Sequence, residues 1–276
     1  MRARLLVVCS SASALSLLTF AIPSVAAPIT FANAVLGDNP IAYWRFGEAP
    51  GAITAVDAAI GHDGTYSALG ITLGQPGIAG GDTGALFDGM NGRVTVPDDS
   101  ELGPDHISME ALVRWDGQNG FQQRILEKSF FLGGEQASYS LSIRDDGKIQ
   151  VEVRAGGGPS LHTSPGAITP GAEAYLVGVF DGDFVRIYQD GNIVLQQGVA
   201  FPGALQDGLN PLGIGNQFER NRPFKGLIDE LALYDYGLSE EQVREHFAAL
   251  QQVPEPGTAM LLLFGIGGWM ARRRPS

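Results

Sequence analysis

The sequence predicts an all-β fold in which two antiparallel sheets pack face to face. Glycine makes up 38 of the 276 residues, about twice its usual share of ~7%, whereas charged residues account for only 17%. This composition is typical of a turn-rich β-protein and excludes a helical bundle or coiled coil, which needs more alanine, leucine and charged residues. The second observation is a series of short segments in which apolar and polar residues alternate, separated by glycine-containing turns.

The strands can be placed in order along the chain from this alternation. Early strands are predicted at residues 41–46, 85–87, 93–96, 108–115 and 124–128. A hairpin follows at residues 139–143 and 149–153, joined by the turn Asp145-Asp146-Gly147. The next three strands, at 175–180, 184–189 and 193–197, are separated by Asp-Gly turns, and the last two are expected at 212–215 and 225–234.

One helix is predicted, close to the end of this region. Ser239 and Gln242 have the spacing of a capping box, and Val243, Phe247 and Leu250 recur at helical spacing. We expect this helix to fold back over the sandwich and to end before Pro254.

The first 26 residues have the three-part pattern of a secretory signal peptide. Arg2 and Arg4 precede an apolar stretch over residues 5–22, and small residues at Ser24 and Ala26 predict cleavage after Ala26. The only cysteine, Cys9, lies inside this segment. The mature chain therefore has no cysteine and cannot use disulfides for stability.

The C-terminus has a second targeting pattern, in residues 253–276. Pro254, Glu255 and Pro256 precede an apolar stretch at residues 257–271, which is shorter than the ~20 residues of a comfortable transmembrane helix, and three arginines follow at 272–274. This order resembles the PEP-CTERM sorting signal. The resemblance implies that the tail holds the protein in the inner membrane of a Gram-negative bacterium until an exosortase removes it near the Pro-Glu-Pro motif. A plain tail anchor, retained by its arginines, is the alternative.

The body, residues 27–252, is read as one domain and resembles the LamG-like branch of the concanavalin A-like jelly rolls. The resemblance is carried by AVLGDNPIAYWRFGE at residues 34–48, GALFDG at 84–89, FKGLIDELALY at 224–234 and GLSEE at 237–241. It implies a two-sheet antiparallel jelly-roll sandwich. Because this fold hosts lectins, glucanases and adhesion modules, it does not by itself assign a function.

The resemblance also implies a structural Ca²⁺ ion. Domains of this type often hold one through a carboxylate on the last strand and an acidic residue near the first strand. Asp229 matches the first of these positions and Glu48 the second. Ca²⁺ takes six to eight oxygen ligands, so two carboxylates with backbone carbonyls and water would suffice. The alternative is that no ion binds: Asp229 would then form hydrogen bonds with the neighbouring backbone at the end of its strand, and Glu48 would lie in a solvated turn.

Catalytic patterns are missing from the sequence, so we expect a protein that is not an enzyme. Related glucanases carry a Glu-x-Asp-x-x-Glu run on one strand, which this chain lacks. Asp229 and Glu230 are adjacent and are predicted to point to opposite faces of a strand. The four histidines, at positions 62, 106, 162 and 246, are isolated and are expected in turns or at the surface.

The binding hypothesis rests on one loop. Phe218, Arg220, Asn221 and Arg222 offer an aromatic face beside guanidinium and amide groups, which suits sugars. An extracellular polysaccharide or surface glycan is the predicted ligand, and exosortase a transient partner. The alternatives are an adhesive module that binds protein only and, third, a divergent glycosidase. The formal net charge of -12 argues against a nucleic-acid partner.

Overall fold

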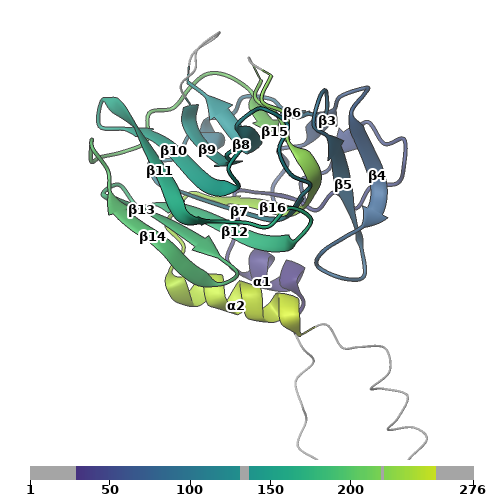
Figure 1. Cartoon of the computed structure of the whole chain (residues 1–276). Coiled ribbons are helices and arrows are strands. Elements are labelled where there is room, and N and C mark those ends of the chain that lie inside the picture. Colours follow the sequence, from purple (N-terminus) through teal and green to yellow (C-terminus); the bar gives the residue numbers. More distant parts are fainter. Residues whose placement is uncertain (1–28, 131–136, 219–220, 253–276) are drawn as a thin grey trace, which may run out of the picture.

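The protein is described here by a computed structural model covering residues 29–130, 137–218 and 221–252. Two antiparallel sheets stack on each other, as the sequence predicts (Figure 1). The first sheet has the order β14(Asn192–Gly198), β13(Phe184–Gln189), β12(Glu173–Phe180), β7(Ile107–Trp115), β16(Lys225–Tyr234), β5(Thr83–Asp88) and β4(Ile71–Pro76), and β1(Ala42–Trp44) also pairs with β16.

The second sheet lies against one face of the first. Its order is β11(Gly158–Ala167), β10(Lys148–Ala155), β9(Ala137–Ile143), β8(Gln123–Ser129), β15(Leu212–Ile214), β6(Val94–Val96), β3(Gly64–Tyr66) and β2(Thr54–Ala55). A short 3-10 helix, η1(Ser100–Leu102), follows β6. Of these strands, β2, β3, β4 and β11 were not predicted, because each is short or interrupted by glycine, serine and proline.

Successive side chains of a strand point to opposite faces of the first sheet, so the buried apolar residues form two layers, one on each face. On β12, Leu176 and Phe180 face the core between the sheets, whereas Tyr175, Val177 and Val179 face the opposite side. The predicted strand tryptophans, Trp44 and Trp115, are both buried in the core between the sheets. Because each face of the first sheet is covered, its central strands are apolar on both sides.

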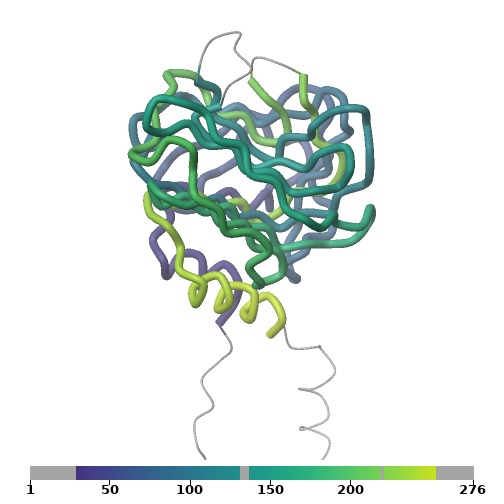
Figure 2. The backbone as a smooth tube through the Cα atoms, turned by 60° about the vertical axis from the view of Figure 1, so that its left-hand side comes forward, coloured from purple at the N-terminus to yellow at the C-terminus, as the bar shows by residue number. Residues whose placement is uncertain are grey.

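Two helices cover the outer face of the first sheet. α1(Phe31–Gly37) and α2(Glu240–Gln251) lie side by side beneath β7, β12 and β16 (Figures 1 and 2). The capping box at Ser239 and Gln242 is confirmed, while α1 was not predicted. The molecule thus has three layers: helices, first sheet and second sheet.

The predicted signal peptide and the sorting segment, residues 253–276, lie outside the described residues. Within the described ranges, no helix combines the length and apolar character needed to cross a membrane.

Candidate functional site

Three carboxyl groups gather beside β5 and β16. Asp229 and Glu230 lie on β16 and are fully buried, and Asp82 directly precedes β5. They offer oxygens that lie within 4.8 Å of one another. Arg45, which follows β1, lies 3.0 Å from a Glu230 oxygen and also contacts Asp82. The guanidinium group thus pairs with two of the three carboxyl groups, which leaves the cluster with excess negative charge when all three are ionised.

The prediction that Asp229 and Glu230 point to opposite faces is wrong. Glu230 has a φ of 49°, in the left-handed region, and the pairing of β16 with β7 shifts between Asp229 and Ala232. A bulge of this kind re-aims a side chain. Both carboxyl groups consequently enter the same cluster, where Tyr43 donates its hydroxyl to Glu230.

The pKa values of these two groups are raised. Burial raises the pKa of Asp229 to about 7, and the charges of Glu230 and Asp82 add to this effect. Burial also raises the pKa of Glu230 to about 7, against the lowering influence of Arg45 and Tyr43. Two buried carboxyl groups that give up their protons only near neutral pH are poised to exchange those protons for a cation.

The oxygens of the cluster fit a Ca²⁺ ion. Asp229 Oδ2 accepts hydrogen bonds from the backbone nitrogens of Ile78 at 2.7 Å and Ala79 at 3.3 Å. Its other oxygen, Oδ1, and Oδ1 of Asp82 are buried and have no hydrogen-bond partner among the described residues. Unpartnered carboxylate oxygens in a negatively charged cluster are the hard ligands that Ca²⁺ requires. Asp82, Asp229 and Glu230 are the residues that could hold it.

Glu48, predicted to share the calcium site with Asp229, is not part of this cluster. One of its carboxylate oxygens accepts a hydrogen bond from the Val56 backbone nitrogen at 2.8 Å, and the other accepts one from the Tyr66 hydroxyl at 2.7 Å. The structure instead brings Asp82 to Asp229. Sequence reasoning missed Asp82 because it lies in a turn whose position depends on the pairing of β4 with β5.

A second polar group of residues covers the outer face of the second sheet. Along β9 and β10 the apolar side chains enter the core between the sheets, so the intervening residues face away from it. Cross-strand pairing arranges these residues in two rows over β8, β9, β10 and β11. The rows are Glu127, Ser140, Glu152 and Leu161, and Arg124, Ser142, Gln150 and Thr163. We call these eight residues the polar face.

Arg124 is the centre of the polar face. Its guanidinium lies 2.5 Å from a Glu127 oxygen and 3.3 Å from a Glu152 oxygen, and it donates to Ser140 Oγ at 2.9 Å and Ser142 Oγ at 3.3 Å. Arg124, Glu127 and Glu152 are all buried. Burial raises the pKa of Glu127, although the charge of Arg124 lowers it. These contacts fix the geometry of the sheet surface, while Leu161 is 56% exposed at its edge.

The predicted ligand loop adjoins this face. The carbonyl of Arg222 accepts a hydrogen bond from the backbone nitrogen of Arg124 at 3.0 Å. Buried Asn216 organises the loop, because its side chain accepts from the Arg222 backbone nitrogen at 2.7 Å and donates to Asn221 Oδ1 at 2.9 Å. Asn221 is exposed and Arg222 partly exposed.

Of the other two predicted ligand residues, the structure describes Phe218 but not Arg220. Phe218 is partly exposed and lies beneath the guanidinium of Arg93, 5.2 Å from its ring centre. Arg220 lies outside the described residues. Thus Phe218, Asn221 and Arg222 are placed in a loop next to the polar face, but sequence reasoning missed the face itself, since its residues come together only through strand register.

The expectation that all four histidines lie in turns or at the surface is wrong for two of them, because buried His162 lies on β11 and buried His246 lies on α2, whereas His62 lies in the loop before β3. His62, His162 and His246 are buried, and only His106 is exposed among the four. His246 lies on the inner side of α2, 3.0 Å from a Glu110 oxygen. The isolation of these residues in sequence gave no information about their partners in space.

Comparison with known protein families agrees with this architecture. The profile of the concanavalin A-like lectin/glucanases superfamily matches residues 88–244, and that of the PEP-CTERM protein-sorting motif matches residues 252–274. The chain belongs to the concanavalin A-like lectin/glucanases superfamily. Its sorting motif marks it for export and exosortase-dependent sorting to the membrane or cell surface. Comparison with curated proteins found no match.

Solved structures similar to this lectin/glucanase domain share its fold at low sequence identity. Domain 4 of AbnA, a GH43 extracellular arabinanase from Geobacillus stearothermophilus, in complex with arabinotriose, has a TM-score of 0.58 at 19% identity, covering 75% of this chain and 98% of that chain. Trypanosoma rangeli sialidase has a TM-score of 0.57 at 14% identity, covering 78% of this chain and 33% of that chain. The binding domain of Paraclostridial Mosquitocidal Protein 1 has a TM-score of 0.60 at 14% identity, covering 77% of this chain and 52% of that chain.

Proposed function

We propose that this protein is an exported, non-enzymatic carbohydrate-binding protein that binds an extracellular polysaccharide at the polar face and its adjoining loop. The observation that carries the proposal is the arrangement of Arg124, Ser140, Ser142 and Gln150 in two rows beside the loop of Asn221 and Arg222. These four side chains are buried, so they support the more accessible groups around them instead of contacting the ligand. Sugar hydroxyls both donate and accept hydrogen bonds, which suits the accessible amide, hydroxyl and guanidinium groups of Asn221, Thr163 and Arg222.

The accessible part of this surface would make the direct contacts. Thr163 on β11 is partly exposed, as are Gln122, directly before β8, and Arg222 in the loop, while Asn221 is exposed. Gln122 donates to Ser142 Oγ at 3.0 Å, so its amide is held in place by the buried residues below. A ligand that meets groups already held in place loses less conformational entropy on binding. The fold accommodates an oligosaccharide in at least one structural neighbour, the arabinanase domain with arabinotriose.

Catalysis is not part of the proposal, even though two carboxyl groups lie on the polar face. A glycosidase needs one carboxyl group as an acid and a second as a nucleophile or base, both open to the substrate. Glu127 and Glu152 are buried, and both pair with Arg124. Glu127 also accepts from Ser129 Oγ and Glu152 from the Ala137 backbone nitrogen. Both carboxyl groups are thus buried and ion-paired inside the protein, which favours a structural role.

A structural Ca²⁺ ion at Asp82, Asp229 and Glu230 belongs to the same proposal. The ion would neutralise the excess negative charge of this cluster and tie β16 to the turn before β5. Its role would be to stabilise the sandwich that presents the polar face.

The route to the cell surface follows from the sorting motif. We propose that the apolar tail holds the protein in the inner membrane of a Gram-negative bacterium until exosortase cleaves it near Pro254, Glu255 and Pro256. Release would then bring the protein to the cell surface or the extracellular matrix.

A glycan array probed with the full chain, with and without Ca²⁺, tests the proposed function. The expected result is binding to a set of polysaccharide fragments and no release of sugar from them. Absence of glycan binding, together with capture of a surface protein, would favour the adhesive alternative. Release of reducing sugar, abolished by substitution of Glu127, would favour the glycosidase.

A further inference from the structure

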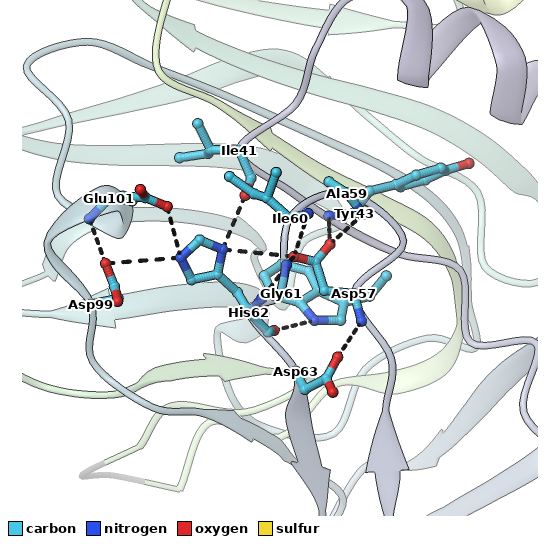
Figure 3. Close-up of polar contacts among 11 residues, drawn as sticks. Ile41, Tyr43, Asp57, Ala59, Ile60, Gly61, His62, Asp63, Asp99 and Glu101 are labelled. Atoms are coloured by element: carbon cyan, nitrogen blue, oxygen red, sulfur yellow. Dashed lines mark hydrogen bonds and ion pairs between the residues drawn. The ribbon is translucent and has the colours of Figure 1, made fainter.

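A second group of possible metal ligands, beside the second sheet, shares no residue with the acidic cluster or with the polar face. His62 precedes β3, and Asp99 and Glu101 belong to the turn of η1 (Figure 3). Their ligand atoms, one from each side chain, lie within 4.8 Å of one another. The histidine side chain is only 8% exposed, whereas both carboxylates are open to solvent.

The loop before β3 holds His62 in one position. Asp57 accepts hydrogen bonds from the backbone nitrogens of Gly61 and His62, both at 2.8 Å, and of Tyr43 at 2.7 Å. The same side chain also accepts hydrogen bonds from the backbone nitrogens of Ala59 at 2.8 Å and Ile60 at 3.3 Å. Asp57 thus holds the loop around itself and fixes the backbone from which the imidazole extends (Figure 3).

The surroundings of the ring determine which nitrogen carries the proton. Nδ1 lies 3.0 Å from the carbonyl oxygen of Ile41 and 3.6 Å from a carboxylate oxygen of Asp57. Both are acceptors, so Nδ1 is the donor. In the neutral ring the lone pair is then on Nε2. A carbonyl or carboxylate behind one nitrogen is the arrangement that orients a histidine for metal binding through the other.

Nε2 points toward the two carboxylates without forming a hydrogen bond to either. It lies 3.5 Å from Glu101 Oε2 and 3.9 Å from Asp99 Oδ1, beyond the 2.7–3.2 Å of an ordinary N–H···O bond. Ligands 2.0–2.2 Å from a tetrahedral ion lie roughly 3.3–3.6 Å from each other. The observed separations are thus nearer to those between ligands of a shared ion than to those of a direct bond.

Asp99 is itself held by η1. Its Oδ1 accepts a hydrogen bond from the Glu101 backbone nitrogen at 2.9 Å, because Asp99 is the N-cap of this helix. One carboxylate is therefore fixed by the cap, and the other, Glu101, is free to adjust its long side chain. A rigid buried imidazole, a fixed carboxylate and an adjustable one can close around an ion with little rearrangement.

We propose that His62, Asp99 and Glu101 bind a divalent transition-metal ion of the Zn²⁺ type. Imidazole nitrogen with carboxylate oxygen suits Zn²⁺ better than Ca²⁺, which takes oxygen ligands alone. Three protein ligands leave one position for water or for a group from a partner. The ion joins the loop before β3 to η1, which are separated in sequence by β3, β4, β5 and β6.

Titration of Zn²⁺ into the full chain, stripped of metal and then saturated with Ca²⁺, tests this site by calorimetry. One Zn²⁺ ion per chain is expected to bind and to raise the melting temperature. Glu101→Gln and Asp99→Asn should each weaken binding about tenfold or more, since even loss of a second-shell partner costs 10–100-fold. Both positions are exposed and asparagine also caps helices, so these variants fold.

His106→Gln is the matched control, because His106 is exposed and outside the cluster. It should leave Zn²⁺ binding unchanged, whereas His62→Gln should abolish it. The Co²⁺-loaded protein should show the visible absorption of a tetrahedral site, and Glu101→Gln should lose it. Absence of saturable Zn²⁺ binding, or equal affinity in the wild type and Glu101→Gln, would overturn the proposal and leave the cluster as a histidine ion pair.

Discussion

Arg124 shows how a single residue organises the polar face. It is buried, and its guanidinium binds carboxylates from two strands, Glu127 on β8 and Glu152 on β10. In the interior, removal of one partner leaves the others as uncompensated charges. The same residue also holds Ser140 and Ser142, so the geometry available to a ligand depends on it.

Arg124→Met should therefore lower the free energy of unfolding by about 3–5 kcal/mol. Urea denaturation of the wild type and the variant measures this. Arg114→Met is a matched control: Arg114 pairs with Asp116 at 2.9 Å, but both side chains are about a third exposed, and such a pair contributes about 0–1 kcal/mol. If both variants lost the same free energy of unfolding, the buried contacts of Arg124 would contribute no more to stability than an exposed ion pair, which would contradict this prediction.

Asp229 is the residue that tests the calcium proposal. In the wild type, Ca²⁺ should raise the melting temperature, and EDTA should reverse the increase, because the ion binds only the folded cluster. Asp229→Asn removes one ionised ligand and should abolish this response. A thermal denaturation scan with Ca²⁺, and a second scan after addition of EDTA, measures the change in melting temperature. Glu48→Gln is the control, because Glu48 lies outside the cluster, and this variant should still respond to Ca²⁺. An unchanged response in Asp229→Asn would place the ion elsewhere.

At the scale of elements, α2 is joined to the first sheet by a buried polar cluster. His246 on α2 and the hydroxyls of Tyr175 on β12 and Tyr234 on β16 all contact Glu110 on β7. The other ring nitrogen of His246 lies 3.2 Å from Asp38, at the end of α1. Burial alone would lower the pKa of His246, but the hydrogen bond to Glu110 and the charges of Glu110 and Asp38 together raise it.

This shift predicts that docking of α2 weakens as the pH rises. A histidine whose pKa is higher in the folded state contributes stability fully below its unfolded pKa of about 6.5 and loses it as the pH rises through the folded value. The free energy of unfolding should thus fall less between pH 6 and pH 8 in His246→Gln than in the wild type.

His162→Gln provides the control with the opposite sign. Burial lowers the pKa of His162, in spite of its hydrogen bond to Gln197, so this histidine costs stability at low pH. Its replacement should make the fall in unfolding free energy between pH 6 and pH 8 steeper. The account of α2 would be wrong if His246→Gln and His162→Gln changed the pH dependence in the same direction.

The elements that the sequence predicts well are those specified locally. The capping box of α2 and the Asp-Gly turns at residues 181–183 and 190–192 set the ends of their elements through neighbouring residues. α1 has seven residues and β2 only two, so each is too short for its apolar pattern to repeat several times. Their existence depends on packing against the rest of the molecule.

The candidate sites were predictable only in part, for a related reason. Asp229 could be selected from its motif on the last strand, but its partner Asp82 is 147 positions earlier in the chain. Asp82 comes close through the pairing of β5 with both β4 and β16. The bulge at Glu230 reverses the expected direction of that side chain. The polar face likewise depends on the register of four strands, which alternation within one strand does not specify.

At the scale of the whole molecule, the helices and the polar face lie on opposite sides of the sandwich. α1 and α2 lie on one side of the sandwich (Figures 1 and 2). The polar face lies on the outer side of the second sheet, because the apolar side chains of its strands enter the core. The sorting tail follows α2 directly in sequence. A protein held by its tail would therefore present the polar face on the side away from the helices.

Cleavage of this tail is expected during export. The mass of the protein isolated from the cell surface should correspond to a chain that begins at residue 27 and ends near Pro254, Glu255 and Pro256, without Arg272–Arg274. The variant Glu255→Ala should keep its full C-terminus. Arg272–Arg274 still present in the exported wild-type protein would instead identify the tail as a permanent anchor.

The central claim is that the polar face and its loop bind carbohydrate. Calorimetry with the oligosaccharide that binds best on the array measures the dissociation constant directly. Three proteins are compared: the wild type, Arg222→Ala in the loop, and Arg244→Ala on the exposed side of α2. Loss of a charged hydrogen bond costs about 1.5–3 kcal/mol, so Arg222→Ala should weaken binding about ten- to hundredfold while Arg244→Ala leaves it unchanged. Equal affinities in all three proteins, or no saturable binding in the wild type, would contradict the claim.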